Sequence, residues 1–385
     1  MKKIIIGIDA SSAKLGGAVT YLKGILNNIE INNEKISKII IWSSSETLSK
    51  IKDFQKIEKR SIEYVGKYPL MRFFWWIFKF NKEVNQSCDI LLNVGGTFFG
   101  SFRPYVTMSR NMLVFDSSES KRYGFRFHRF RYFLLRLTQS FTFLNATGII
   151  FISNYAKKII TDKLDFKRRD VMIELINHGL TKQFENINKS IKNLKGKEIR
   201  VLYISTIDEY KHQWNLIEAV SGLLNQYNVR LDFIGGIGSK ESQKRFNDSR
   251  LKFDKENKFI NYHGILNHDE ISKLYKNADI FIYLSTCENM PSILIEAMSS
   301  GIPIISSNYE PMPEFCENGA LYVDPLSVID IRDKIKRLVD DTNLRKNLSE
   351  ISFNNSMKYN WNKCSKETFD FIYKVYNKYQ ENKIK

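Results

Sequence analysis

The segment 279–307 constrains the fold of this chain more than any other part of the sequence. Its two short apolar runs, Asp279–Leu284 and Ile302–Ser306, are typical of buried parallel strands. The residues between them predict a helix from about Pro291 to Ser300, because proline suits the first helical turn and Gly301 suits the position just past the end. A strand, a helix and a strand in this order predict an α/β protein with a parallel sheet.

Two glutamates of this segment are candidates for a binding site. Glu288 precedes the predicted helix and Glu296 lies on it, so both can point to the carboxyl end of the first strand, where ligands bind in open α/β sheets. A helix start favours a phosphate, and carboxylates accept hydrogen bonds from sugar or ribose hydroxyls. These features indicate a nucleotide-sugar site. The alternative interpretation is that Glu288 caps the helix and Glu296 is an ordinary solvated residue.

The run Glu-Asn-Met-Pro-Ser-Ile-Leu-Ile-Glu-Ala-Met at 288–298, with the glycine and the Ile-Pro-Ile-Ile strand after it, resembles the donor-site motif of family 4 glycosyltransferases (glycosyl transferases group 1). The resemblance implies the GT-B fold, with two Rossmann-like domains that face each other across a cleft. It also implies that Glu288 lies by the transferred sugar and that Glu296 binds the nucleotide ribose. Asn289 and Met290 stand where the family commonly has glycine and an aromatic residue, and Pro291 and Ser292 complete the donor-binding turn.

Other residues of the predicted donor site are spread along the chain. Gly16 and Gly17 lie between a predicted strand and a helix, an arrangement that can bind phosphate but that is also common in ordinary turns. The resemblance implies that this pair faces the donor diphosphate. It equates Lys211 with a lysine that neutralises the diphosphate, while Thr206 occupies the position of the family's arginine. Gly264 and Ile265 follow a strand that resembles the one whose backbone holds the base.

Four residues are candidates for the acceptor side. Arg110, Asn111 and Asp116 belong to a segment that resembles part of some bacterial polysaccharide transferases. His178 lies in the run Asn-His-Gly-Leu, which resembles the element that closes the first domain in the family.

Charge and aromatic content point to an anionic partner. The 59 Lys and Arg residues exceed the 42 Asp and Glu residues, which leaves a net charge of +17. Segment 70–80 has six aromatic residues, and segment 121–137 has six Lys or Arg and no acid. The second segment also carries a helical apolar stripe: Tyr123, Phe127, Phe130, Leu134 and Leu137. Both segments suit either the protein core or an anionic membrane surface.

The sequence predicts four parts: an acceptor-binding domain at 1–181, a polar linker at 182–198, a nucleotide-sugar-binding domain at 199–355, and a C-terminal helix at 356–385 that packs back on the first domain. The four cysteines lack metal-ligand spacing and no signal peptide is recognisable. We therefore expect a cytoplasmic protein that can bind peripherally to the inner face of the membrane.

The resulting hypothesis is a retaining, metal-independent glycosyltransferase with Glu288 and Lys211 as catalytic residues. It would use a nucleotide-diphosphate sugar as co-substrate, no cofactor and no metal, and a glycan or lipid-linked acceptor in capsule or lipopolysaccharide synthesis. The alternatives are another GT-B enzyme, such as an epimerase or a phosphorylase, and a non-catalytic basic protein that binds membranes or nucleic acid. The chain has no recognisable nucleic-acid module, so nucleic acid is not expected as a partner.

Overall fold

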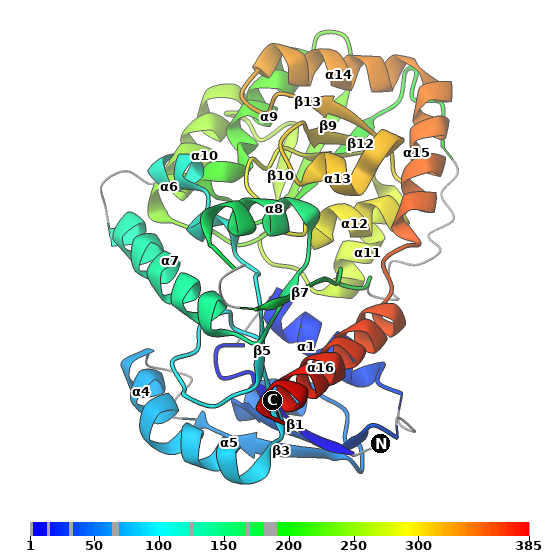
Figure 1. Cartoon of the computed structure of the whole chain (residues 1–385). Helices are drawn as coiled ribbons and strands as arrows, with labels where there is room; N and C mark the ends of the chain where they lie inside the picture. Colours follow the sequence, from blue (N-terminus) through cyan, green and yellow to red (C-terminus); the bar gives the residue numbers. More distant parts are fainter. Residues whose placement is uncertain are drawn as a thin grey trace. The chain divides into compact units, whose positions relative to one another are not determined.

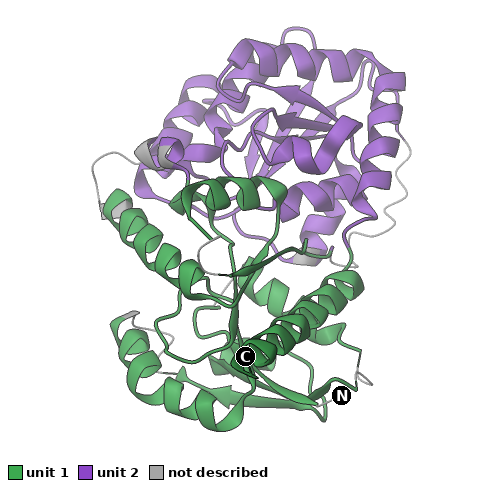
Figure 2. Cartoon of the chain, in the orientation of Figure 1, with its two compact units in different colours: residues 1–115, 125–179, 360–385 green, residues 116–124, 180–359 purple. Residues whose placement is uncertain are grey.

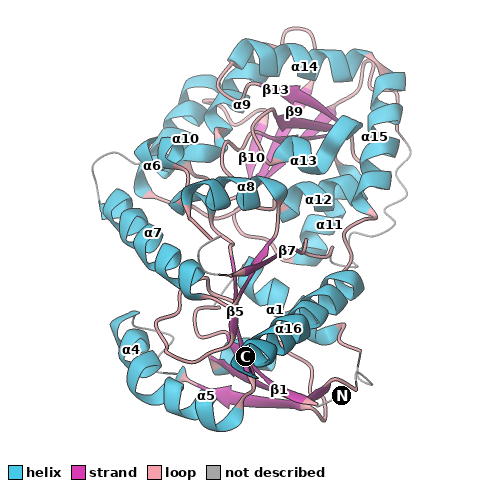
Figure 3. Cartoon of the chain, viewed as in Figure 1, coloured by secondary structure: helices cyan, strands magenta, loops and turns pink. Residues whose placement is uncertain are grey.

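The computed structural model describes residues 3–13, 16–30, 34–63, 69–122, 127–166, 170–180 and 191–384. The chain divides into two compact units (Figure 2). Unit 1 comprises residues 1–115, 125–179 and 360–385, and unit 2 comprises residues 116–124 and 180–359. Each unit has a parallel sheet surrounded by helices (Figure 3).

Unit 1 is built on a seven-stranded sheet in the order β3-β2-β1-β4-β5-β6-β7. Its strands, all paired in parallel, are β1 (Ile4–Asp9), β2 (Ile36–Ser43), β3 (Ile57–Ser61), β4 (Ile90–Asn93), β5 (Tyr105–Met108), β6 (Gly148–Phe151) and β7 (Met172–Leu175). The order reverses between β1 and β4, which is the point of such a sheet where ligands bind.

The helices of unit 1 are α1 (Gly17–Asn27), α2 (Ser45–Ser49), α4 (Pro69–Phe74), the π-helix η1 (Trp75–Phe80), α5 (Asn81–Ser87), η2 (Met112–Val114), α7 (Phe127–Asn145), α8 (Asn154–Lys163) and α16 (Trp361–Ile384). The aromatic segment 70–80 therefore spans α4 and η1. One face of this segment packs in the core, where Trp75, Trp76 and Phe80 are buried. The other face carries Phe74 and Phe78, which are exposed.

The C-terminal helix α16 packs on α1 in unit 1, and Figure 1 shows the two side by side. Ser365 Oγ donates a hydrogen bond of 2.7 Å to the carbonyl of Ile25. Trp361 lies against Gly24, where an added Cβ would come within 2.1 Å of the indole ring. The chain thus returns to unit 1 after it has completed unit 2.

Unit 2 is built on a six-stranded parallel sheet in the order β10-β9-β8-β11-β12-β13. Its strands are β8 (Ile199–Ile204), β9 (Val229–Ile234), β10 (Ile260–Tyr262), β11 (Ile280–Tyr283), β12 (Ile304–Ser307) and β13 (Ala320–Val323). Its helices are α6 (Ser117–Arg122), η5 (Glu209–Lys211), α9 (Gln213–Ser221), α10 (Lys240–Phe253), α11 (His268–Asn277), α12 (Ser292–Ser299), α13 (Met312–Cys316), η6 (Glu317–Gly319), α14 (Val328–Asp340) and α15 (Thr342–Ser356).

Alternate residues of the unit 2 strands enter two separate hydrophobic cores. Val201 and Tyr203 of β8 belong to one core, and Leu202 and Ile204 belong to the other. Both faces of the sheet are therefore covered, as expected for parallel strands that read as continuous apolar runs.

The unit boundaries differ from the domain boundaries that the sequence predicts. Unit 2 resumes at Leu180 and ends at Tyr359, whereas the sequence predicts a linker at 182–198 and a second domain at 199–355. Of the predicted linker, residues 182–190 lie outside the described residues. In addition, residues 116–124 belong to unit 2 and not to the first domain, because α6 contacts η5.

The structure describes the basic segment 121–137 in two parts. α6 ends at Arg122 in unit 2 and α7 begins at Phe127 in unit 1, while residues 123–126, including Tyr123, lie outside the described residues. Within the described ranges, no helix is both long enough and apolar enough to cross a membrane.

Candidate active site

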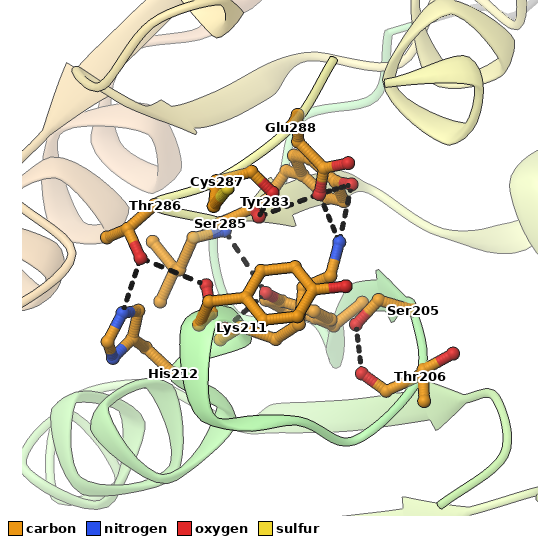
Figure 4. Close-up of polar contacts among 12 residues, drawn as sticks. Ser205, Thr206, Lys211, His212, Tyr283, Ser285, Thr286, Cys287 and Glu288 are labelled. Atoms are coloured by element: carbon orange, nitrogen blue, oxygen red, sulfur yellow. Dashed lines mark hydrogen bonds and ion pairs between the residues drawn. The ribbon is translucent and has the colours of Figure 1, made fainter. Parts of the chain in front are cut away.

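A buried lysine and a glutamate meet in unit 2. Lys211 Nζ donates a hydrogen bond to Glu288 Oε1 and another, of 2.9 Å, to the hydroxyl of Tyr283. The same Oε1 accepts hydrogen bonds of 2.7 Å from Tyr283 and from Ser285 (Figure 4). Every hydrogen bond that the described residues make with this carboxylate ends on Oε1.

The sheet order explains why residues so far apart in the sequence meet. Lys211 follows β8 and Glu288 follows β11, and these two strands are neighbours whose carboxyl ends lie at one edge of the sheet. Tyr203 joins the two loops, because its hydroxyl donates to the carbonyl of Lys211 and accepts from the amide of Leu284 at 3.2 Å. The pair is therefore held by backbone as well as by side chains.

Two aromatic rings lie near the ammonium group of Lys211. The side chain is only 6% exposed, and Nζ lies 4.8 Å from the ring centroids of both Tyr210 and Tyr283. Burial and the neighbouring Glu288 carboxylate raise the pKa of Tyr283 well above its ordinary value, so its phenol stays protonated and donates. A buried ion pair with this desolvation cost is more typical of a functional site than of a stabilising contact.

His212 supports the loop that carries Lys211. It adopts the left-handed conformation at φ 52°, and its Nε2 lies 3.2 Å from Thr286 Oγ1. Burial lowers the pKa of His212 to about 3, so the imidazole is neutral at physiological pH. The amide of Thr286 also donates to the carbonyl of Tyr210 at 2.9 Å, which adds a second link between the two loops.

Helix α6 brings further charge to the same unit. Glu119 is buried and forms a 2.8 Å ion pair with Arg122, and α6 contacts η5. Burial and, to a smaller extent, the carboxylate of Asp116 raise the pKa of the Cys287 thiol well above its ordinary range. Asp116 is thus in the unit of the Lys211–Glu288 pair and not in the predicted acceptor domain. Its Oδ1 accepts from the amides of Ser118 and Glu119, so it caps α6.

Glu296 lies on α12 and is half-buried, so it is not an ordinary, fully solvated residue. Burial raises the pKa of Glu296 to about 8, and the described residues offer its carboxyl group no ion pair. The helix begins at Ser292 with Pro291 as its N-cap, one residue later than predicted. Gly301 follows the helix at φ 66°, as predicted.

The remaining predicted donor residues lie in loops of unit 2. Asn289 is buried, and Met290 packs against the core that contains β11. Gly264 has φ 69° and its carbonyl accepts from the amide of Gly235 at 2.8 Å, while Ile265 is exposed. Thr206 is exposed, and its carbonyl accepts a 2.9 Å hydrogen bond from Gln213.

Four predicted residues form a second group in unit 1. Arg110 Nη2 lies 3.0 Å from the position that a Cβ of Gly17 would take, at the start of α1, whose N-cap Gly16 has φ 65°. Burial lowers the pKa of Arg110 to about 10. Burial and the charge of Arg110 lower the pKa of His178 to about 3, and its ring lies 4.9 Å from that of Tyr21.

Asn111 does not join this second group through its side-chain oxygen. That oxygen accepts a 3.1 Å hydrogen bond from the amide of Leu113 and so caps η2. Of the four residues predicted for the acceptor side, Arg110 and His178 come together, whereas Asn111 and Asp116 cap helices.

Three residues of the site were missed from the sequence. Tyr283 and Ser285 stand at the carboxyl end of a predicted strand, and this position could have identified them as partners of Glu288. Nothing local distinguishes Tyr203 from the other apolar residues of its strand, because its role depends on the pairing of β8 with β11.

Two units, each with a parallel sheet covered by helices, are the arrangement of the GT-B fold. In agreement with this fold, Anabaena HepE in complex with UDP-glucose superimposes with a TM-score of 0.72 at 16% identity, covering 96% of this chain and 99% of that chain. Residues 184–354 match the family model "Glycosyl transferases group 1". This part of the chain, which contains Lys211 and Glu288, is thus similar to the group 1 glycosyltransferases, and we call residues 184–354 the family domain.

Curated relatives agree with this assignment. The capsular polysaccharide biosynthesis glycosyltransferase CapM of Staphylococcus aureus is 27% identical over 273 residues, which is 66% of this chain and 68% of CapM. An uncharacterized glycosyltransferase of Methanocaldococcus jannaschii is 26% identical over 197 residues, 49% of this chain. The match to this archaeal relative spans 48% of its length, about half.

Proposed function

We propose that this protein transfers a sugar from a nucleotide-diphosphate sugar to a glycan or lipid-linked glycan in the synthesis of a surface polysaccharide. The observation that carries the proposal is the buried Lys211–Glu288 pair at the carboxyl ends of β8 and β11, within the family domain. The names of CapM and of an Escherichia coli O-antigen chain mannosyltransferase support the polysaccharide assignment. The UDP-glucose complex of HepE supports a nucleotide-sugar donor.

The geometry suggests a division of roles. Lys211 would stabilise the negative charge that develops on the leaving diphosphate, since a fixed cation in a water-poor site acts strongly on such charge. Glu288 would accept a hydrogen bond from a hydroxyl of the transferred sugar at Oε2, while Tyr283 and Ser285 hold Oε1. Glu296 would receive the ribose. Within unit 1, Gly16 and Gly17 at the start of α1 stay a predicted phosphate-binding element.

We further propose retention of the anomeric configuration by front-face attack. In this step the acceptor hydroxyl forms the new bond to the anomeric carbon as the bond to the diphosphate breaks, and a leaving phosphate oxygen takes the hydroxyl proton. Lys211 provides a cation for the diphosphate, so turnover is expected without added divalent metal. A cytoplasmic reaction agrees with the four free cysteines, because disulfides are rare in reducing compartments.

A ligand screen tests the proposal. The purified chain is heated with UDP-, GDP-, ADP- and dTDP-sugars in the presence of EDTA, and donor hydrolysis is followed in parallel. At 100 times the dissociation constant, the right donor adds roughly 2.7 kcal/mol and raises Tm by a few degrees. If no nucleotide sugar shifts Tm or is hydrolysed, the proposal fails. If the donor is converted to an epimer without an acceptor, the protein is an epimerase. If turnover requires inorganic phosphate, it is a phosphorylase. Either result would replace the proposed transferase activity with another GT-B activity.

A further inference from the structure

Helix α7 exposes its apolar side. Phe130, Phe133, Leu134, Leu137 and Phe141 follow the helical spacing i, i+3, i+4, i+7 and i+11, and they are 44–60% exposed. The sequence interpretation that placed the stripe of Phe130, Leu134 and Leu137 in the core is therefore wrong for these residues.

The opposite side of α7 explains this orientation. Gln139, Thr142 and Phe143 are buried, and Thr142 Oγ1 accepts from the amide of Phe98 at 2.9 Å and donates to its carbonyl at 3.2 Å. The carbonyl of Thr142 also accepts a 2.6 Å hydrogen bond from the hydroxyl of Tyr105. Because these polar contacts fix the helix on the sheet, the phenylalanine and leucine side chains have to face outward.

A second exposed apolar group lies on α4 and η1. Leu70 is 75% exposed, Phe74 55%, Ile77 38% and Phe78 74%. The π-helical turn buries Trp75 and Trp76 and leaves the side chains on either side of them outside. This segment is therefore apolar on both its buried side and its exposed side.

Aromatic contacts join the two groups into one surface within unit 1. The ring centroids of Phe78 and Phe74 are 6.2 Å apart, with the rings stacked. Phe73 makes edge-to-face contacts with Phe74 and Phe99, at centroid distances of 5.7 and 5.2 Å. Phe99 in turn stacks on Phe141 of α7 at 6.1 Å. We call the exposed hydrophobic residues of 70–78 and 130–141 the apolar surface. A contiguous exposed area of this kind on a monomer marks an interaction site.

The two segments that form the apolar surface carry charges of one sign. Segments 69–82 and 127–145 contain no aspartate or glutamate, and they contain these cations: Arg72, Lys79, Lys82, Arg129, Arg131 and Arg136. Lys79, Lys82 and Arg131 are exposed. Phenylalanine and leucine next to lysine and arginine are typical of surfaces that lie in the headgroup region of a bilayer, with the cations near anionic lipids.

We propose that the apolar surface docks on a bilayer that carries anionic lipid, with the phenylalanine and leucine side chains among the acyl chains and the cations at the headgroups. Docking is inferred only from the exposure of the apolar side chains and the charge of the two segments. Docking would also bring unit 1 to an acceptor held in the membrane, and this part rests on the proposed function. In this mode of binding the apolar surface enters one leaflet of the bilayer and does not cross it.

Vesicle flotation of the full chain tests docking without any nucleotide sugar. We expect the wild type to float with vesicles of phosphatidylcholine and 30% phosphatidylglycerol at low salt, and about tenfold less with phosphatidylcholine alone. Flotation should weaken near 0.5 M salt, because screening acts on the headgroup attraction. Failure to float with the anionic vesicles would overturn the proposal.

Matched variants locate the contact. F78S/F133S should lower the bound fraction at least about tenfold, because each phenylalanine loses the free energy of apolar transfer. L251S in unit 2, at a leucine that is 66% exposed, is the control and should float like the wild type. For charge, K82Q/R131Q should weaken binding to anionic vesicles and K276Q should not. Equal flotation of F78S/F133S and the wild type would overturn the proposal.

Two further results separate the alternatives. If sedimentation shows a dimer that F78S/F133S dissolves, and vesicles do not bind, the apolar surface is an interface between copies of this chain and the proposal is wrong. If the wild type floats but no donor is hydrolysed, docking holds and the proposed function fails. We expect F78S/F133S to hydrolyse the donor in solution at the wild-type rate, because neither phenylalanine belongs to the Lys211–Glu288 site.

Discussion

Lys211 and Glu288, 77 residues apart in the sequence, form a hydrogen-bonded ion pair in which the lysine is also held by Tyr283 and the glutamate by Ser285. The lysine cannot leave this position without breaking two hydrogen bonds. The arrangement therefore fixes a positive charge beside the Glu288 carboxylate.

Replacing Glu288 by glutamine should lower kcat by about a hundredfold or more, in line with the loss of one preorganised group in a catalytic site. The side-chain shape and one acceptor oxygen remain, so Tm should change by only a few degrees. The measurement is donor hydrolysis and transfer at saturating nucleotide sugar. E256Q, at an exposed glutamate that is paired with Lys258, is the control and should behave like the wild type. Full activity of E288Q would remove Glu288 from the site.

Replacing Lys211 by methionine should reduce the affinity for the nucleoside diphosphate product as well as the turnover, because the cation faces the leaving group. Calorimetric titration with the free diphosphate and with the corresponding nucleoside separates the two effects. We expect the variant to lose affinity for the diphosphate and to keep its affinity for the nucleoside. An equal loss for both ligands would indicate that the loop has collapsed and that the lysine has a structural role.

Glu296 should make the ligand-free protein less stable at alkaline pH. Burial raises its pKa in the folded state to about 8, above the ordinary value of 4.5 that applies after unfolding. The folded state then holds one more proton between these values, so stability falls as pH rises from about 4.5 to about 8. The slope is up to about 1.4 kcal/mol per pH unit. Urea unfolding of E296Q should show a smaller loss over this range, and an unchanged loss would contradict the assignment.

His178 and His212 should act in the opposite direction at acidic pH. Burial lowers the pKa of each to about 3 in the folded state, whereas the unfolded chain titrates near 6.5. The unfolded state therefore binds more protons between pH 6.5 and 3, and stability falls as pH drops through this window. H178F and H212F should each reduce the acid sensitivity in urea unfolding between pH 7 and 5. The prediction fails if both variants lose stability with acid as steeply as the wild type.

Local signals and long-range contacts differ in what the sequence can reveal. The strand, helix and strand of 279–307 were predictable because apolar runs, Pro291 and Gly301 act over a few residues. The transfer of Asp116 to unit 2 was not, since it depends on contacts between α6 and η5. The periodicity of α7 shows that Phe130, Leu134 and Leu137 share a face. It does not show that the face is outside, because Thr142 decides this through contacts with Phe98.

The packing of α16 on α1 leads to a last prediction, about Gly24. A Cβ at this position would lie 2.1 Å from the Trp361 ring, so G24A should force the two helices apart and cost roughly 1–3 kcal/mol, as overpacked cores do. Gly222 is the matched control, because a Cβ there meets its nearest atom at 3.4 Å, an ordinary contact. G222A should therefore unfold in urea at nearly the wild-type midpoint. In the double variant G24A/W361A the indole ring is absent, so the new Cβ at residue 24 has nothing to clash with. The loss of unfolding free energy in the double variant should therefore be smaller than the sum of the losses in the two single variants. Strict additivity would mean that Gly24 and Trp361 do not touch in solution and that α16 is not seated on α1 as described.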